Sequence, residues 1–206
     1  MQAEPSRRSN RARSDATRAD LIAAARRLFI AKGYAETATP DIVAAAGVTR
    51  GALYHHFEDK RALFRAVVEA EAESVAAEIE LAAPGDLPAR EALIRGGEAY
   101  LLAMAEPGRT RLLLLDGPAV LGRADMDAID SRHAARSLRE GIVYGVETGI
   151  FPVNLPVDAI VALLASAFDR AALAIETGGR AEDYNAALAA LIDGLAVPGG
   201  SQAPTV

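Results

Sequence analysis

The sequence predicts an all-α protein with a small N-terminal domain and a larger C-terminal domain. Hydrophobic residues make up 51% of the 206 residues, which is enough for a sizeable core, and alanine, the strongest helix former, supplies much of that fraction. Aromatic residues make up only 5%, and runs of β-branched residues are rare. Apolar residues recur with a helical period between Gly and Pro breaks, of which Pro84-Gly85 is the clearest.

The N-terminal segment has the size of a helix-turn-helix. A first helix is expected to begin at 14–17, and a short second helix follows at about 39–46. Gly47 ends the second helix because glycine tolerates a left-handed backbone. The hydroxyl of Thr49 then caps a third helix that runs to His55. Two short helices joined by a Gly-containing turn are typical of a helix-turn-helix.

A long helix at 59–82 is expected to link this head to the rest of the chain. Gly and Pro breaks divide the remainder into helices at about 88–105, 109–116, 123–148, 156–177 and 181–196. The predicted domains are a disordered basic arm at 1–13, a helix-turn-helix domain at 14–65, a helical domain at 66–198 and a flexible tail at 199–206.

Charge is distributed unevenly along the chain. Residues 1–65 hold twelve Lys/Arg and seven Asp/Glu, a net charge of +5, whereas the remainder carries −11 of the total of −6. A basic head on an acidic body is typical of a DNA-binding domain joined to a second domain. The arginines of the arm at 1–13 leave two interpretations open: solubilising charge, or an arm that follows the minor groove or the phosphates of DNA.

Composition also excludes several classes of protein. The absence of cysteine excludes disulfides, zinc-thiolate sites and thiol catalysis, and fits a cytoplasmic location. The first twenty residues lack the apolar core of a signal peptide. No apolar run reaches the roughly 18 residues that span a bilayer, so no membrane partner is expected.

The most specific motif lies in the predicted helix-turn-helix. Ala-Gly-Val-Thr at 46–49 is followed by Gly-x-Leu-Tyr-x-His-Phe at 51–57 and by Lys60, and the first helix ends in Phe-Ile-Ala-Lys-Gly-Tyr at 29–34. On these residues, segment 17–65 resembles the DNA-binding domain of the tetracycline-repressor (TetR) family of bacterial regulators. The resemblance implies a C-terminal helical ligand-binding and dimerisation domain behind the DNA-binding head.

The helix at 49–55 is expected to enter the major groove of double-stranded DNA. Arg50 can donate two hydrogen bonds to a guanine, while Gly51 and Ala52 let the backbone come close and Ala52 can touch a thymine methyl. The resemblance assigns similar roles to these positions. The expected phosphate contacts are Thr37, Thr39, Thr49, Tyr54, His55 and Lys60.

By the same resemblance, the C-terminal domain encloses a pocket for a small-molecule effector. Mostly apolar walls with few polar groups suit a largely apolar effector. The alternative, that the wall residues form ordinary core, stays open. The candidate wall residues are Tyr100, Met104, Leu114, Val143, Tyr144 and Phe168.

Helices 156–177 and 181–196 are expected to form a homodimer interface. The first is apolar nearly all round and so needs cover on more than one side, and the second carries an apolar stripe. Burial within a single core is the alternative. Glycines at 141, 145 and 149, spaced by four, are interpreted as a smooth ridge that lets another helix pack closely.

The combined prediction is a sequence-specific transcriptional regulator, a repressor released from a palindromic operator by its effector. An activator of the same fold and a helical interaction protein that does not bind DNA are the alternatives. No enzyme is expected, because the chain lacks a Walker loop, a dinucleotide-binding Gly cluster, a nucleophile elbow and zinc-protease spacing. No cofactor or metal is expected either, because the adjacent His55 and His56 point in different directions on a helix.

Overall fold

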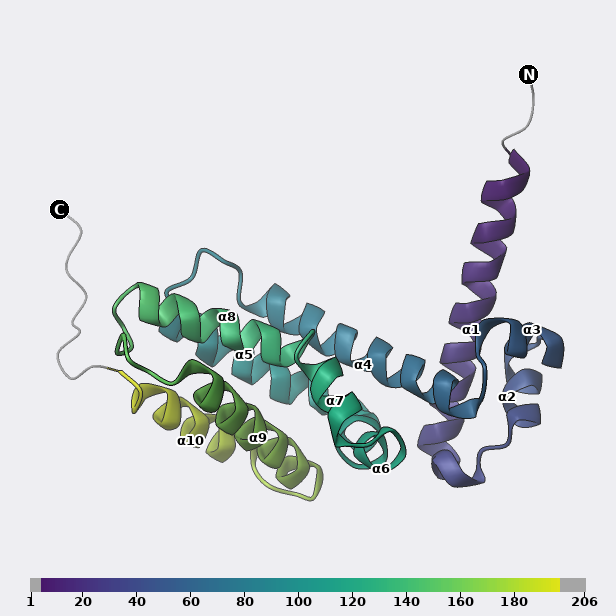
Figure 1. The fold of residues 1–206 in the computed structure, drawn as a ribbon. Coiled ribbons are helices and arrows are strands. Elements are labelled where there is room, and N and C mark those ends of the chain that lie inside the picture. Colours follow the sequence, from purple (N-terminus) through teal and green to yellow (C-terminus); the bar gives the residue numbers. More distant parts are fainter. Residues whose placement is uncertain (1–4, 197–206) are drawn as a thin grey trace. The chain divides into compact units, whose positions relative to one another are not determined.

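The computed structural model describes residues 5–196 and confirms the all-α class, since this part of the chain contains helices and no strand (Figure 1). It forms two compact units. The first comprises the described residues up to Glu71 together with Arg111–Ala124, and the second comprises Ala72–Thr110 and the described residues from Asp125 onward. The predicted flexible tail at 199–206 lies outside the described residues.

The first unit is built on three N-terminal helices, α1 (Pro5–Glu36), α2 (Thr39–Ala46) and α3 (Arg50–His56), as Figure 1 shows. α1 begins at Pro5, whereas the sequence placed the helix start at 14–17 behind a disordered arm. Proline suits the first turn of a helix because its φ is already helical and its missing N–H would be unpaired there. No other proline and no glycine precedes Gly33, so nothing in the sequence interrupts the helix.

The turn between α2 and α3 follows the local sequence signals. Gly47 adopts a left-handed conformation with φ 66°, and its N–H bonds back to the end of α2. The Thr49 hydroxyl accepts a hydrogen bond from the Ala52 N–H at 3.1 Å, as expected for an N-cap. Ile42 and Leu53 are fully buried, so both short helices pack their inner faces into the core.

The first half of α4 (Lys60–Ala82) completes the core of the first unit. Asp59 caps this helix, because its carboxylate accepts a hydrogen bond from the Ala62 N–H at 2.7 Å. The ring of Phe64 packs edge-on against Phe29 and Tyr34, with centroids 5.1 and 5.0 Å apart. Edge-to-face aromatic pairs stabilise a core beyond their buried area.

Residues 111–124 belong to the first unit, although the sequence placed them in the C-terminal domain at 66–198. They form a π-helical turn (Arg111–Asp116) and α6 (Gly117–Leu121). The π-helical turn packs on α1, and Leu112 is fully buried. The Arg61 guanidinium donates to the carbonyl of Leu121 at 2.9 Å, which ties α6 to the start of α4.

The second unit packs α5 (Ala89–Met104) against α8 (Ala134–Glu147), α9 (Val157–Glu176) and α10 (Ala181–Asp193). Glycines allow this close packing. A Cβ added at Gly145 would lie 2.3 Å from the ring of Phe151, and one at Gly141 would lie 2.7 Å from Leu93 on α5. The close approach of another helix is therefore confirmed at Gly141, whereas Gly145 makes room for Phe151 in the segment that follows α8 and Gly149 meets no atom within 4 Å.

The predicted single helix at 123–148 is wrong, because the structure breaks it into α7 (Arg123–Asp130) and α8. His133, between the two helices, has a non-helical backbone with φ −123° and ψ −112°. The N–H groups of Arg132 and His133 donate to carbonyls only three residues earlier, those of Ile129 at 3.0 Å and Asp130 at 2.9 Å, so the chain makes a turn before α8 begins.

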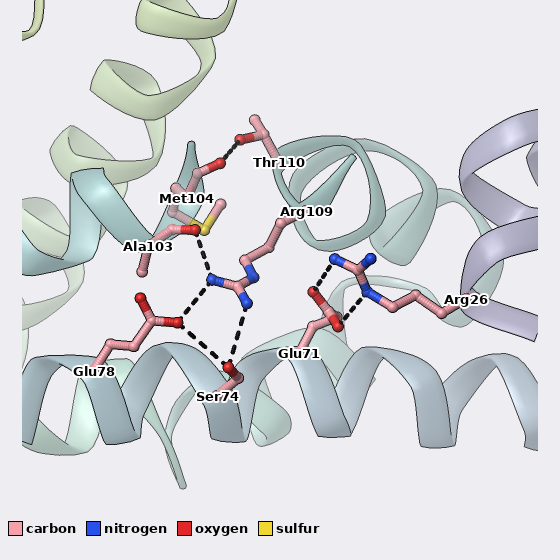
Figure 2. Close-up of polar contacts among 8 residues, drawn as sticks. All are labelled: Arg26, Glu71, Ser74, Glu78, Ala103, Met104, Arg109 and Thr110. Carbon is pink, nitrogen blue, oxygen red and sulfur yellow. Dashed lines mark hydrogen bonds and ion pairs between the residues drawn. The ribbon is translucent and has the colours of Figure 1, made fainter. Parts of the chain in front are cut away.

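A buried arginine holds the end of α5 to the second half of α4 (Figure 2). Arg109 is 6% exposed. Its guanidinium donates to the Ala103 carbonyl at 2.6 Å, to Glu78 at 3.0 Å and to the Ser74 hydroxyl at 3.3 Å. The Thr110 hydroxyl adds a bond of 2.8 Å to the Met104 carbonyl. Charge-assisted bonds of this kind fix the loop that follows α5.

Within residues 5–196, no helix is both long enough and apolar enough to cross a lipid bilayer.

Candidate nucleic-acid interface and ligand cavity

The outward face of α3 is the candidate DNA-reading surface. Leu53 points into the core, while Arg50, Gly51, Tyr54 and His55 are exposed. The Arg50 guanidinium lies over the Tyr54 ring, with 5.5 Å between Cζ and the ring centroid. Stacking on an aromatic ring orders a flexible arginine side chain. The arrangement presents one oriented cation near the N-terminus of the helix, the end that approaches base edges in helix-turn-helix proteins.

The charge of this face suits a polyanion. α3 contains no acidic residue. On the neighbouring α1, the Arg18 guanidinium lies 5.3 Å from the ring centroid of Phe57, which follows the last residue of α3. Cations from two helices therefore flank α3, Arg50 at its first residue and Arg18 at the residue after its last, which suits phosphate binding.

Thr49, Thr39 and Ala52 are at least partly accessible to solvent, as their predicted DNA contacts require. The Thr49 hydroxyl is exposed, and since it accepts the Ala52 N–H, its own proton remains a donor for a phosphate. Thr39 is half-buried at the first position of α2, and Ala52 is half-buried on α3.

Thr37 and Lys60 make hydrogen bonds within the chain. Thr37 is fully buried, which argues against a phosphate contact, and its hydroxyl donates to the carbonyls of Gly33 at 2.7 Å and Leu28 at 3.2 Å. The Lys60 ammonium donates to the carbonyls of Tyr34 at 2.9 Å and Thr37 at 3.2 Å, and because Lys60 is half-buried its phosphate contact stays a prediction. Cations and hydroxyls commonly satisfy the last carbonyls of a helix, so both residues help to cap the end of α1.

The adjacent histidines of α3 are not arranged to bind a metal ion together. The rings of His55 and His56 lie edge to face with centroids 5.2 Å apart. In the described residues, no group of three or more His, Cys, Asp or Glu side chains converges on a common point that could hold an ion.

The second unit contains a cavity of about 280 Å³, enclosed by α4, α5, α7, α8 and α9. This volume is near the lower end of the range for small-molecule sites, about 300–1,000 Å³. Leu93 and Gly97 line it from α5, and Phe168 and Ala165 line it from α9. A Cβ added at Gly97 would lie 2.6 Å from the Phe168 ring, so glycine at this position lets that ring pack against α5.

The cavity brings together three of the six expected pocket residues, Tyr100, Tyr144 and Phe168. The other three do not line it. Met104 is buried at the end of α5, and Leu114 belongs to the π-helical turn of the first unit. Val143 precedes Tyr144 on α8, and one residue along a helix turns a side chain by about 100° away from the cavity.

One end of the cavity is polar. The Tyr100 hydroxyl donates to Asp169 Oδ1 at 2.6 Å. Burial, followed by the charge of Asp169, raises the pKa of Tyr100 well above its ordinary value, so the hydroxyl stays protonated. Burial and the nearby Asp169 also raise the pKa of Asp130 to about 6. These carboxylates are the polar groups that the sequence analysis missed.

Signals for the missed groups exist in the sequence. Asp169 interrupts a helix that is otherwise apolar nearly all round, and it follows Phe168 directly. Ser137 and Tyr144 lie seven residues apart, two helical turns, on the cavity face of α8. Asp130 could not be placed, because its position depends on the break between α7 and α8.

Fold and surface together define a class: a helix-turn-helix head joined to a helical body with a ligand-sized cavity. Comparison with known proteins specifies the family. The family description "Bacterial regulatory proteins, tetR family" matches residues 21–67, and "Tetracyclin repressor-like, C-terminal domain" matches residues 90–197. A crystal structure of a TetR-family transcriptional regulator from Pectobacterium atrosepticum is 33% identical, covers 91% of this chain and 98% of its own, and has a TM-score of 0.71.

Curated relatives match a limited part of this chain. The HTH-type transcriptional regulator TtgR of Pseudomonas putida is 49% identical over 53 residues, which is 26% of this chain and 25% of that protein. AcrR of Shigella flexneri is 42% identical over 74 residues, or 36% of this chain and 34% of that protein. The chain thus matches about a quarter to a third of the length of these relatives.

The chain belongs to the tetR family of bacterial regulatory proteins. It is a transcription regulator with an N-terminal helix-turn-helix DNA-binding domain and a tetracycline-repressor-like C-terminal domain. The family consists of regulators and points away from an enzyme.

Proposed function

We propose that this protein is a homodimeric transcriptional repressor that leaves its operator when a small molecule enters the cavity of the second unit. The exposed Arg50–Tyr54 pair on the outward face of α3 carries the DNA-binding part of this proposal. The operator is a palindrome in double-stranded DNA, because a two-fold symmetric dimer presents two identical α3 helices to two half-sites. The protein acts in the bacterial cytoplasm.

The dimer interface of the proposal lies on α9 and α10. Leu163 on α9 is 68% exposed and Leu191 on α10 is 53% exposed. Large apolar side chains on neighbouring helices favour an interface with a second copy, where they would be removed from water. Sedimentation velocity of the double variant Leu163→Asp and Leu191→Asp is expected to show a monomer, and a variant that remains dimeric would place the interface elsewhere.

Release from DNA follows as a coupling between two sites. In such a dimer the two α3 helices must sit roughly 34–36 Å apart, or a multiple of this, to reach successive major grooves. A ligand that prefers a different spacing weakens DNA binding, with a typical coupling free energy of about 1–3 kcal/mol. α4 is continuous from the first unit into the second, so it is the helix whose position both the DNA-binding face and the cavity can influence.

Fluorescence anisotropy with the DNA upstream of the protein's own gene tests the proposal. Preferential binding over a scrambled duplex is expected, with affinity that falls steeply as salt rises. Arg50→Ala and Tyr54→Ala should lose the preference for the native sequence. Arg95→Ala, an exposed arginine paired with Glu91 on α5, removes the same charge elsewhere and should not. Binding that is equally strong for all four proteins would contradict the proposed DNA-reading face.

A further inference from the structure

Several hydroxyl groups on the helices of this chain bond back to a carbonyl one turn earlier. Thr148 donates to the Tyr144 carbonyl at 2.7 Å, and Ser166 donates to the Ala162 carbonyl at 2.9 Å. Ser137 on α8 differs, because its hydroxyl oxygen is buried and has no hydrogen-bond partner in the described part of the chain. Buried polar atoms are nearly always satisfied in native proteins, so this hydroxyl requires an explanation.

The break between α7 and α8 accounts for the missing bond. Ser137 lies in the first turn of α8, and the carbonyl four residues before it belongs to His133, whose backbone is not helical. That carbonyl already accepts the N–H groups of Arg136 at 3.1 Å and of Ser137 itself at 3.3 Å. A carbonyl oxygen has two lone pairs, so these two bonds leave none for the Ser137 hydroxyl.

Ser137 also lines the cavity of the second unit. Gly141 and Tyr144 follow it on the same face of α8, one and two helical turns further along, and both line the cavity as well. Leu93 of α5 and Phe168 of α9 contribute apolar side chains to the lining. A serine hydroxyl can turn among three staggered rotamers without any shift of its helix. A ligand group in the cavity can therefore supply the hydrogen bond that the protein does not.

The chemistry of hydrogen bonding narrows the class of that group. An oxygen atom that accepts the Ser137 proton would satisfy the hydroxyl, whereas an ammonium group has only donors and cannot accept it. A carboxylate could accept the proton, but the residues of the cavity lining include no Lys, Arg or His to pair with an anion. The lining instead contains four carboxylates, those of Glu80, Asp130, Glu140 and Asp169. An alcohol or a ketone fits the lining better, because it accepts a hydrogen bond without adding a buried charge.

We propose that the cavity binds a neutral molecule with an apolar body and one oxygen group, which accepts a hydrogen bond from the Ser137 hydroxyl. The inference rests on the proposed function, which supplies the role of effector, and it adds a polar anchor to the largely apolar molecule that the sequence suggested. The apolar body lies between α5, α8 and α9. Burial of its surface supplies most of the affinity, and the hydrogen bond to Ser137 fixes its orientation.

Three probes of similar size isolate the oxygen group: 3-phenylpropan-1-ol, butylbenzene and 3-phenylpropionate. Butylbenzene has a methyl group in place of the hydroxyl, and 3-phenylpropionate is an anion at pH 7.5. Binding to the full chain is measured by isothermal titration calorimetry at this pH, with protein titrated into the sparingly soluble hydrocarbon. Ser137→Ala removes the hydroxyl at nearly constant shape. Ser166→Ala is the matched control, because the Ser166 hydroxyl bonds a carbonyl of its own helix and the residue lies outside the cavity lining.

The quantity compared is the affinity for the alcohol divided by the affinity for the hydrocarbon, which cancels the apolar contribution that the two probes share. Ser137→Ala should lower this ratio about three- to tenfold, the range of one neutral hydrogen bond, and Ser166→Ala should leave it unchanged. The carboxylate should bind about tenfold or more weaker than the alcohol. An unchanged ratio in Ser137→Ala, a carboxylate that binds as tightly as the alcohol, or no measurable binding of the alcohol would overturn the proposal.

The stability of the ligand-free protein gives an independent readout. Ser137→Ala removes a buried polar atom that has no partner, so the variant should melt at the same temperature as the parent or higher. Saturating 3-phenylpropan-1-ol should then raise the melting temperature of the variant less than that of the parent. A ligand-free variant that melts several degrees lower would mean that the hydroxyl has a partner within the protein, which contradicts the proposal.

A further measurement separates this inference from the proposed function. The same probes are added to the DNA complex and its anisotropy is followed. If the alcohol binds with the expected dependence on Ser137 but leaves DNA binding unchanged, the ligand site stands and the effector role falls. If a probe releases DNA equally well from the parent and from Ser137→Ala, the regulatory role stands and the assignment of Ser137 as the anchor is wrong.

Discussion

Arg26 of α1 donates two hydrogen bonds to the carboxylate of Glu71 on α4, at 2.7 and 3.1 Å, and so fixes the long N-terminal helix to α4 within the first unit (Figure 2). The Glu71 side chain is only 9% exposed and that of Arg26 is 26% exposed. A two-point bond between planar groups sets distance and angle together. The orientation of α1 against α4 therefore depends on this pair.

Arg26→Ala is expected to lower the free energy of unfolding by about 2–4 kcal/mol, because a buried carboxylate loses its two-point partner. The contrasting variant Lys32→Ala breaks an ion pair with Asp41 in the same unit, where both side chains are 45% exposed. Exposed pairs contribute about 0–1 kcal/mol. Urea unfolding of both variants checks the difference, and equal losses would show that burial does not strengthen the Arg26–Glu71 pair.

Thr37→Val tests whether Thr37 stabilises the end of α1 or contacts DNA. The variant should lose about 1–2 kcal/mol of stability, because the carbonyls of Gly33 and Leu28 lose their donor. Its affinity for operator DNA should change by less than about twofold, which is under half of 1 kcal/mol. Thr39→Val should show the opposite pattern, with little loss of stability and weaker DNA binding. A large loss of affinity in Thr37→Val alone would restore the phosphate contact that the sequence suggested.

Local signals made the head predictable from the sequence. Gly47 ends α2 because glycine tolerates the left-handed backbone found there, and the Thr49 hydroxyl caps α3 by accepting the N–H of the residue three positions later. The outward face of α3 follows from the helical period, because the apolar Leu53 marks the inward face. Neither inference needs knowledge of a distant part of the chain.

Other features depend on residues far apart in the sequence. The phosphate contact of Lys60 stays a prediction, but the carbonyls that its ammonium bonds lie at the end of α1 and just after it, 23 to 26 residues earlier. In the predicted continuous helix, Asp130 would be an ordinary surface carboxylate. It lines the cavity because the helix breaks before α8 and because α9 packs nearby. Residues 111–124 join the first unit through contacts that no local pattern records.

Gly145→Ala tests the close packing of the second unit. An added Cβ would lie 2.3 Å from the ring of Phe151, which is 2% exposed and cannot move into solvent. Overpacking of this kind typically costs about 1–3 kcal/mol. Gly141→Ala should cost less, because the atom it meets at 2.7 Å is the end of the Leu93 side chain, which can rotate away.

The control for both is Gly85→Ala, since nothing lies within 4 Å of a Cβ at that position. Thermal unfolding by circular dichroism should rank the variants with Gly145→Ala least stable and Gly85→Ala closest to the parent. The packing argument fails if Gly145→Ala and Gly85→Ala melt at the same temperature.

The last prediction concerns the dependence of stability on pH. Folding raises the pKa of Asp130 from 3.8 to about 6, so the folded state favours the protonated carboxyl. The ionised form therefore opposes folding: the penalty is absent below pH 4, grows as pH rises from 4 to 6, and stays constant above 6. A shift of about two units corresponds to at most about 3 kcal/mol.

Asp130→Asn removes this titration and leaves the surrounding Asp127, His133 and Asp169 in place. The melting temperature of the variant minus that of the parent should rise between pH 4 and 6 and then remain level. A difference in melting temperature that is constant across this range would mean that the pKa of Asp130 is the same in the folded and unfolded states.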